Sequence, residues 1–591
     1  MWEAMAAGVG SRGSGVGVGR LVVVFPTPDA RLPTPESAAA AKRRNAIVRR
    51  DMARKFSCYP SPALAAPSAL LRWWLVVIVI ALSIHLGGFP LLDPDEGRNA
   101  EVGREMAATN DYVMPRLDGL PYLDKPIVYF AAEAAVMEVL GPTEVAARLP
   151  AFLFTIATAA FLWWFAKRVW GSEEAIIAAI VFLATPLAVA FSRTVIFDSA
   201  LAMFITMATA FLYLACDESA RKWTALAWLC IGLGVITKGP VAIALPLLVA
   251  IPYAISRKRF RALWSWSGLA LFVLAIAPWV WAISREIPDF LHYVVVTETA
   301  QRLATKALKR TGPPWYFIPY FIGGALPWSI VLMGSPRAID RRDRSTIYML
   351  LWIAIPFLFF SISQSKRPQY ILPLMAPIAL LVARIWRDAR SGSRAAAAVL
   401  LVFGLALVIA PPFLHIRAEY GDAARLSAIA IGVTFLIGGA LAFVTRRDIA
   451  LIALTIPVIA IPLAANPMMR AIGARRSEAT FIEQLRPMVS PRSEVVGIEA
   501  FTGSMTFYLQ RPMTVVTPDA EEFTSNYLIR HYANFAGGAS IKPMAWLDTA
   551  LADATPRIFI VRVNDASHRA QLAVRGLRVV ASDARYVAYA R

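Results

Sequence analysis

Acidic and basic side chains gather just after the first long apolar run of the sequence. Asp93, Asp95, Glu96 and Arg98 form one group, and the segment Tyr122–Pro126, which contains an aspartate and a lysine, forms a second. Charged groups are costly at bilayer depth, so their position beside an apolar run indicates a functional site at the membrane surface. A carboxylate there can orient or deprotonate an acceptor hydroxyl, while a nearby cation stabilises a departing anion.

Two later segments carry further candidate groups. Arg193 and Asp198 precede a long apolar run, where the alternative role of the aspartate is to cap the next helix. A short turn contains Lys366, Arg367 and Tyr370. Tyrosine is frequent in the aromatic belts at membrane interfaces, so an anchoring role is the alternative for Tyr370.

The first acidic group also contains a helix start signal. In the run Asp93-Pro94-Asp95-Glu96, an Asp at the N-cap precedes a Pro at the first helical position and a Glu at the third. This pattern assigns Asp93 to helix capping. It leaves Asp95 for another role.

The composition is that of a polytopic α-helical membrane protein. Hydrophobic residues make up 58% of the chain and charged residues 17%, and apolar runs recur from Trp73 to Ala465. The net charge of +20 lies largely in short loops, where Lys and Arg report orientation and not nucleic-acid binding. The three cysteines have no metal-ligand spacing, so neither a zinc site nor a disulfide framework is predicted.

Loop charge predicts the topology. The positive-inside rule places six basic loops in the cytoplasm, and the short segment 127–140, with its two glutamates, is then expected as a helix at the interface. The N-terminus is predicted inside and the C-terminus outside. About thirteen spans follow, near residues 73–92, 149–165, 175–191, 199–216, 223–237, 240–255, 263–283, 315–333, 347–362, 370–385, 395–414, 426–444 and 449–465.

Three regions are predicted on this basis. Residues 1–70 form a disordered, basic cytoplasmic tail, in which Met52 is an alternative translation start. Residues 71–468 form the transmembrane region, with periplasmic juxtamembrane helices near 93–141. Residues 469–591 form a small periplasmic α/β domain with strands near 494–499, 557–562 and 577–581, helices near 478–485 and 566–573, and no evident catalytic constellation.

Cations persist in the loops that this topology places outside. They suggest an anionic ligand at the outer leaflet, most simply the phosphate of a lipid carrier, and the alternative is that they are snorkelling side chains at span ends. These residues are Arg98, Arg104, Lys125, Arg193, Lys238, Arg302, Lys306, Lys309, Arg310, Lys366 and Arg367.

The same residues resemble the motifs of the C-class (GT-C) membrane glycosyltransferases. The similarity covers roughly residues 72–465 and is greatest to bacterial lipid A aminoarabinose transferases and the dolichyl-phosphate-mannose protein mannosyltransferases. The matching motifs are Pro94-Asp95-Glu96-x-Arg98, Tyr122-Leu-Asp124-Lys125-Pro126, Arg193-(x)4-Asp198, Glu298-Thr-Ala-Gln301-Arg302 and Lys366-(x)3-Tyr370-Ile-Leu-Pro373.

The resemblance implies roles for individual residues. Asp95 matches the catalytic acid of the first external loop, and Asp198 matches a second essential carboxylate. The substrate-binding residues that the motifs imply are Glu96, Arg98, Lys125, Arg302, Lys366 and Tyr370, among which Lys125, Arg302 and Tyr370 match positions that bind the lipid phosphate. Two positions depart from the family pattern: the Glu-Lys pair is Asp124-Lys125 here, and a metal-binding His is Thr299.

The predicted function is therefore transfer of a sugar from a polyprenyl-phosphate donor at the periplasmic face of a bacterial inner membrane. The acceptor is lipid A, another glycan or a protein. No metal or other cofactor is identified, a divalent metal having no support at Thr299, and no nucleic-acid partner is expected. The alternatives are a secondary transporter, which should show internal symmetry and polar groups at mid-bilayer, and a non-catalytic lipid-binding protein.

Overall fold

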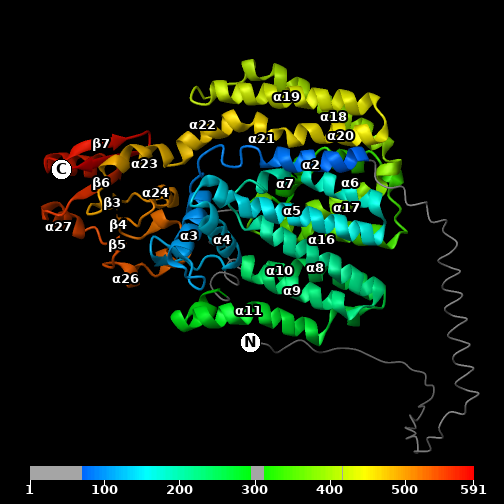
Figure 1. Ribbon diagram of the computed structural model, residues 1–591, viewed down its shortest axis with the longest axis horizontal. Coiled ribbons are helices and arrows are strands. Elements are labelled where there is room, and N and C mark those ends of the chain that lie inside the picture. Colours follow the sequence, from blue (N-terminus) through cyan, green and yellow to red (C-terminus); the bar gives the residue numbers. More distant parts are fainter. Residues whose placement is uncertain (1–68, 295–311, 416) are drawn as a thin grey trace, which may run out of the picture. The chain divides into compact units, whose positions relative to one another are not determined.

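The computed structural model describes residues 69–294, 312–415 and 417–591 (Figure 1). Residues Ala65–Arg591 pack as one compact unit, so the apolar helices and the C-terminal region share a continuous set of contacts. Most of the expected cytoplasmic tail and the predicted phosphate ligand Arg302 lie outside the described residues.

Apolar helices dominate the unit up to residue 476. In the described ranges, eight helical segments are long and apolar enough to cross a membrane: Glu144–Val169, Asp198–Glu218, Phe260–Glu286, Arg344–Ile362, Pro368–Asp388, Arg390–Ile409, Gly421–Val444 and Arg447–Arg476. The chain is thus mostly helical and apolar, as its composition predicts.

The helices of this region vary widely in length. In chain order they are α2 (Ala69–Ser83), α5 (Glu144–Val169), α6 (Ser172–Leu183), α7 (Pro186–Phe191), α8 (Asp198–Glu218), α9 (Arg221–Lys238), α10 (Val241–Ser256), η1 (Phe260–Leu263), α11 (Trp266–Glu286), α12 (Phe290–His292), η3 (Pro314–Tyr316), α14 (Phe317–Gly324), α15 (Trp328–Met333), η4 (Pro336–Ala338), α16 (Arg344–Ile362), η5 (Pro368–Leu374), α17 (Met375–Ile385), η6 (Trp386–Asp388), α18 (Arg390–Ile409), η7 (Pro411–Phe413), α19 (Gly421–Val444), α20 (Arg447–Ile459), α21 (Ile461–Ala464) and α22 (Asn466–Arg476).

Each of the thirteen predicted spans overlaps at least one of these helices. Several of them are interrupted, among them 175–191 between α6 and α7, 315–333 between α14 and α15, and 449–465 between α20 and α21. Proline stands at these three breaks, at Pro186, Pro327 and Pro462, where it has no backbone N–H to continue the preceding helix. The number of membrane crossings therefore stays a prediction.

The segment between α2 and α5 forms a small layer of its own. It contains α3 (Asp95–Thr109), the hairpin of β1 (Arg116–Leu117) and β2 (Leu120–Pro121), and α4 (Val128–Leu140). The helix expected over 127–140 is therefore present. Its buried residues and those of α3 pack in one apolar cluster with residues of the C-terminal region.

The predicted capping role of Asp93 is wrong. The residue before α3 is Pro94, and no side chain caps this helix. The Asp93 carboxylate instead accepts hydrogen bonds from the backbone N–H and the hydroxyl of Ser504, at the start of α24 (Gly503–Leu509). Burial raises the pKa of Asp93 to about 6, although the bonds from Ser504 oppose the shift. The carboxylate thus joins α3 to the C-terminal region.

The C-terminal region contains both strands and helices. Its six-stranded sheet has the order β5-β4-β3-β6-β8-β7, and β5, β4, β3 and β6 run parallel while β8 is antiparallel to both of its neighbours. The strands are β3 (Glu494–Ile498), β4 (Thr514–Val516), β5 (Ile541–Lys542), β6 (Arg557–Arg562), β7 (Arg578–Ser582) and β8 (Tyr586–Ala590).

Helices cover both faces of this sheet. Besides α24, the helices of the region are α23 (Ala479–Leu485), η8 (Arg486–Met488), η9 (Glu521–Phe523), α25 (Asn526–Arg530), α26 (Tyr532–Phe535), α27 (Trp546–Ala552) and α28 (Ala566–Val574). Residues of α23 and α24 contribute to the apolar cluster on one face, and residues of α27 and α28 contribute to the cluster on the other.

The C-terminal region approaches α3 very closely. In Figure 1, α24 lies beside α3, and a Cβ atom on Gly503 would stand 2.3 Å from the Arg98 Cα atom. Any side chain at this position would force the two helices apart, so the glycine permits the contact. The contact places the loop after β4 next to the acidic end of α3.

Candidate active site

One cavity of about 130 Å³ brings the candidate functional groups together. Its walls come from the start of α3, the loop before α4, the start of α8, the end of α9, the η5 turn, and the loop between η9 and α25. The lining residues are Asp95, Arg98, Asn99, Tyr122, Asp124, Lys125, Ile196, Phe197, Asp198, Lys238, Arg367, Gln369, Tyr370, Thr524 and Asn526. Four cations and three carboxylates therefore face a single small space.

Asp95 is the most accessible carboxylate of the cavity. One oxygen accepts a hydrogen bond from Arg98 at 2.7 Å and the other accepts one from Arg367 at 3.2 Å, while 41% of the side chain stays exposed. Burial alone would raise the pKa of Asp95, but the two guanidinium groups outweigh it and lower the pKa below its ordinary value. Asp95 is thus an ionised, accessible and oriented carboxylate.

Asp198 forms a second charged pair in the same cavity. Its Oδ1 atom accepts a hydrogen bond from the Lys238 Nζ atom at 2.5 Å, and the side chain is almost fully buried. Its Oδ2 atom is also buried and has no hydrogen-bond partner among the described residues. Although α8 begins at Asp198, the side chain makes no capping bond, so the capping alternative has no support.

Arg98 connects the cavity to the C-terminal region. Besides Asp95, its guanidinium group donates to the hydroxyl of Thr524 at 2.7 Å. Its charge also lies 5.9 Å from the centre of the Tyr122 ring. These contacts hold the guanidinium group between α3 and the loop after η9, with Asp95 in front of it.

Lys125 and Tyr370, two of the predicted binding residues, both lie on the cavity wall. The Lys125 Nζ atom donates to the backbone oxygen of Asp124 at 2.6 Å. The Tyr370 hydroxyl lies 3.4 Å from the Ser365 hydroxyl, and the Lys238 ammonium group lies 5.3 Å from the centre of the Tyr370 ring. A ligand in the cavity would therefore meet both the phenol and the lysines.

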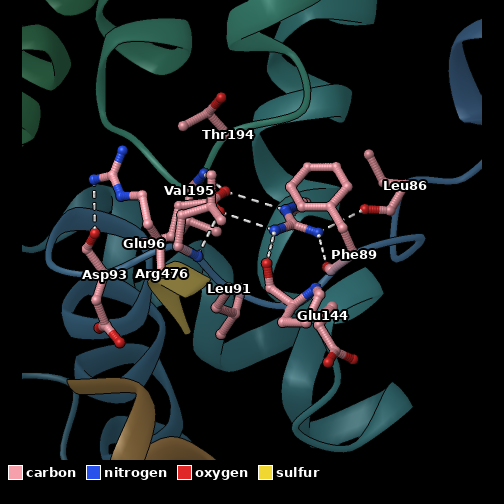
Figure 2. A network of polar contacts seen from close by, with 12 residues as sticks. Leu86, Phe89, Leu91, Asp93, Glu96, Glu144, Thr194, Val195 and Arg476 are labelled. Carbon is pink, nitrogen blue, oxygen red and sulfur yellow. Dashed lines mark hydrogen bonds and ion pairs between the residues drawn. The ribbon is translucent and has the colours of Figure 1, made fainter. Parts of the chain in front are cut away.

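Glu96 does not reach the cavity. It lies in the buried polar network shown in Figure 2, where each carboxylate oxygen accepts two hydrogen bonds. The donors are the guanidinium group of Arg148 and the backbone N–H groups of Leu92 and Val195. The Glu96 carboxylate is thus fully engaged within the protein, and the substrate-binding role expected for it stays a prediction.

Arg148 completes this network. It is fully buried, and it also donates to the backbone oxygens of Leu86, Phe89 and Pro90 at 2.8–3.2 Å. The pair of Arg148 and Glu96 thus fixes the segment that leads from α2 into α3 (Figure 2). Since Asp95 is the neighbour of Glu96, the network also fixes the position of Asp95.

Of the adjacent residues Lys366 and Arg367, only Arg367 lines the cavity. The Lys366 ammonium group is buried and donates to the backbone oxygens of Phe360, Ser361 and Ser363, at the end of α16. Lys366 is thus a helix-end cap and not a wall of the cavity. Arg367, which the predicted binding set does not include, lines the cavity and contacts Asp95.

The C-terminal region contributes residues that sequence reasoning missed. Thr524 and Asn526 line the cavity, although no catalytic pattern was evident in this region. The Asp124 carboxylate holds their loop by accepting hydrogen bonds from the backbone N–H groups of Asn526 and Tyr527 at 2.8 and 3.1 Å. No local signal in the sequence identifies these residues, because the approach to Asp124 depends on tertiary packing.

The carboxylates of the cavity have cations as their neighbours among the described residues. No group of three or more His, Cys, Asp or Glu side chains that could hold a metal ion occurs within residues 69–294, 312–415 and 417–591. The carboxylates of the cavity are instead paired with Arg98, Arg367 and Lys238.

The chain is similar to membrane glycosyltransferases. The family model described as dolichyl-phosphate-mannose-protein mannosyltransferase matches residues 124–281. A protein of Erwinia tasmaniensis named undecaprenyl phosphate-alpha-4-amino-4-deoxy-L-arabinose arabinosyl transferase is 33% identical over 381 residues, which are 59% of this chain and 69% of that protein. The protein of the same name from Yersinia enterocolitica is 31% identical, over 61% of this chain and 68% of that protein.

A solved structure shares the fold. The crystal structure of ArnT from Cupriavidus metallidurans bound to undecaprenyl phosphate superimposes with a TM-score of 0.79 at 25% identity, covering 89% of this chain and 98% of that chain. The same protein in the apo state gives a TM-score of 0.75. The GT-C fold that the sequence motifs imply is therefore confirmed.

Proposed function

Because this chain belongs to the family of undecaprenyl phosphate-alpha-4-amino-4-deoxy-L-arabinose arabinosyl transferases, we propose that its cavity transfers a sugar from polyprenyl phosphate to an acceptor. The observation that carries the proposal is the meeting of Asp95 and Asp198 with four cations in that cavity. Such an arrangement suits a reaction in which a phosphate leaves one side of a sugar and an acceptor attacks the other.

The donor is assigned to a lipid-linked 4-amino-4-deoxy-arabinose. The names of the relatives specify this sugar and undecaprenyl phosphate, and the similar crystal structure holds undecaprenyl phosphate. The acceptor that we favour is lipid A, because the sequence motifs resemble those of bacterial lipid A aminoarabinose transferases. Another glycan or a protein would use the same chemistry, so the assay below compares acceptors.

The carboxylates handle the acceptor and the sugar. Asp95 is ionised and accessible, so it can orient an attacking acceptor oxygen or take its proton as that oxygen bonds to the anomeric carbon. The Asp198 Oδ2 atom has no partner in the described residues and can accept a hydrogen bond from a hydroxyl or amine of the sugar. Both groups would act from fixed positions.

The cations handle the leaving group. As the bond between the anomeric carbon and the lipid phosphate breaks, the electron pair leaves with the phosphate. Lys125, Lys238 and Arg367 line the cavity and can stabilise the charge that develops on it. We assign Arg98 to holding Asp95 and Tyr370 to the cavity wall beside the phosphate, and Arg302 keeps the phosphate-binding role that its motif implies.

The membrane arrangement follows from the loop charges. We propose thirteen spans in a bacterial inner membrane, with the N-terminus in the cytoplasm and the cavity and the C-terminal sheet at the periplasmic face. The hydrogen bonds that Ser504 donates to Asp93 and that Asn526 donates to Asp124 support placing the sheet on the same side as the cavity.

Transfer by the purified full-length protein tests the proposal. Undecaprenyl-phosphate-linked aminoarabinose would be supplied with lipid A, with a non-lipid glycan or with a protein, and each product would be analysed by mass spectrometry. Modification of lipid A by the wild type and not by Asp95→Asn is the expected result. A wild-type protein that transfers nothing, but carries a labelled solute into proteoliposomes, would overturn the enzymatic function in favour of transport.

A further inference from the structure

A second charged crevice lies at the other end of the helices that build the cavity. It has a volume of about 1080 Å³ and is formed by the end of α8, the start of α9, the end of α10 and the segment that leads through η1 into α11. The lining residues are Ala215, Ser219, Ala220, Arg221, Thr224, Ile255, Lys258, Arg259, Phe260, Arg261, Ala262, Trp264, Ser265, Trp266 and Ser267.

The helix directions separate this crevice from the cavity by one bilayer. Asp198 begins α8 and Lys238 ends α9, and both line the cavity, whereas the crevice uses the opposite ends of the same two helices. A helix such as α9 (Arg221–Lys238) spans about 26 Å at 1.5 Å per residue, close to the hydrocarbon thickness of a bilayer. The crevice therefore faces the leaflet opposite the transfer site.

The lining of the crevice carries cations and no carboxylate. Arg221, Lys258, Arg259 and Arg261 line it, and none of its lining residues is acidic. No ion pair within the described ranges joins these four cations to a carboxylate, and the nearby Glu218 is already bound to Arg168 at 2.7 Å. Arg387 and Arg447, by contrast, are both paired with Glu173.

The walls of the crevice are fixed. The Thr224 hydroxyl donates to the Ala262 backbone oxygen at 2.7 Å, and the Trp228 indole donates to the Leu263 backbone oxygen at 3.0 Å. Trp264 and Trp266 meet edge to face at 5.8 Å, and they are 50% and 77% exposed. Tryptophans with this exposure are typical of the level of lipid headgroups.

An apolar groove continues from the crevice along α11. The groove shares Trp266 with the crevice, and its volume is about 750 Å³. Its other lining residues are Leu269, Ala270, Val273, Leu274, Ala277, Pro278 and Trp281. A cationic pocket joined to an apolar groove at one tryptophan matches the two parts of a phospholipid, an anionic headgroup and an acyl chain.

We propose that this crevice binds the headgroup of an anionic phospholipid in the leaflet opposite the transfer site, with an acyl chain along α11. The four cations recognise the phosphate, since clustered Lys and Arg attract anionic lipid at a membrane surface. The adjoining groove favours a lipid over a free phosphate, which has no apolar part. The proposal does not depend on the chemistry of the cavity.

Native mass spectrometry of the purified full-length protein tests it. Dioleoyl phosphatidylglycerol would be titrated into the detergent solution, with dioleoyl phosphatidylcholine as the zwitterionic reference. The variant Arg221→Ala/Arg261→Ala removes two cations and leaves the bond between Arg259 and the Ser219 hydroxyl intact. Since each cation near an anionic surface contributes roughly a fivefold gain, this variant should bind phosphatidylglycerol about 30-fold more weakly.

Arg341→Ala/Arg342→Ala is the matched control. These two exposed arginines line no described crevice. They lie at the same end of the bundle as the crevice, because they precede Ser345, which accepts a hydrogen bond from Trp170, close to the pair of Arg168 and Glu218. The control variant removes the same number of positive charges. Equal weakening in this control would show a general surface attraction and overturn the proposal.

Two further measurements distinguish a lipid headgroup from free phosphate as the ligand of the crevice. Inorganic phosphate at millimolar concentration should leave lipid binding unchanged, and complete displacement of phosphatidylglycerol would show a small-anion site instead. Trp266→Ala should weaken phosphatidylglycerol binding because the tryptophan joins the two parts of the site. Unaltered binding by both Trp266→Ala and Arg221→Ala/Arg261→Ala would also overturn the proposal.

Discussion

The adjacent residues Lys366 and Arg367 should respond to mutation in opposite ways. The Lys366 ammonium group makes three hydrogen bonds to backbone oxygens at the end of α16, whereas Arg367 contacts Asp95 on the cavity wall. Replacement of each residue by methionine keeps most of the side-chain length and removes the charge. The two variants therefore separate a folding role from a binding role.

The expected magnitudes differ by site. Hydrogen bonds to a charged group contribute about 1.5–3 kcal/mol, and the three bonds of Lys366 share one donor group, so Lys366→Met should lose roughly 3 kcal/mol of stability. The ion pair of Arg367 and Asp95 is partly exposed, with 26% and 41% of the side chains accessible, so its loss should cost less than about 1 kcal/mol.

The effect on donor binding should be larger for Arg367→Met than for Lys366→Met. If Arg367 contacts the phosphate of the donor, loss of one charge-assisted hydrogen bond should weaken donor binding about ten- to a hundredfold. Lys366→Met that folds should retain the wild-type KM for the donor.

The assay pairs thermal unfolding in detergent with transfer kinetics. Each variant would be measured for its apparent Tm and for kcat and KM with the undecaprenyl-phosphate donor. A Lys366→Met variant with the wild-type Tm and a raised KM would show that this lysine acts on the ligand, against the folding role. An Arg367→Met variant with a lowered Tm and an unchanged KM would equally contradict the binding role of the arginine.

Further predictions concern the carboxylates, the buried network and the topology. Asp95→Asn and Asp198→Asn should each abolish transfer while the protein still inserts and purifies, and near wild-type turnover would remove that residue from the mechanism. Arg148→Met should destabilise the protein by about 3–5 kcal/mol because it leaves the buried Glu96 unpaired, as a lowered Tm would show, and an unchanged Tm would contradict the positioning role. The pKa of Asp93 is raised from 3.8 to about 6, so the folded protein favours the protonated carboxyl. The contribution of this group to the free energy of unfolding is therefore fully present below pH 3.8 and is lost as the pH rises through about 6. The Tm of the wild type should thus fall relative to Asp93→Asn over that range, and parallel curves would refute the assignment. A cysteine in the loop 337–344 should be shielded from an impermeant thiol reagent in intact cells and one at the C-terminus should react, and the opposite labelling would overturn the topology.

The sequence predicts the class of fold because apolar runs and helical length depend on local composition. The runs from Trp73 to Ala465 all become helices in the described residues, and the strands expected near 494–499, 557–562 and 577–581 are present. Strands β4, β5 and β8 were not predicted. Two of them are only two or three residues long, and pairing with a neighbouring strand decides whether such short segments become strands.

The sequence by itself also determines the types of chemical groups at the site. Asp95, Asp198, Lys125 and Tyr370 were identified from charge beside apolar runs and from motif resemblance, and the structure brings all four to one cavity. Charge is expensive near a bilayer whatever the fold, so these residues are visible in the sequence alone.

Only the tertiary structure decides which neighbour in a charged pair serves the site. Lys366 and Arg367 are indistinguishable by type and spacing, and so are Asp95 and Glu96, yet in each pair one side chain lines the cavity and the other is buried in hydrogen bonds. Tertiary structure also decides that Thr524 and Asn526 reach the cavity, because Asp124 holds their loop. Adjacent residues on a helix or turn point in different directions, and partners distant in the chain determine which direction faces the ligand.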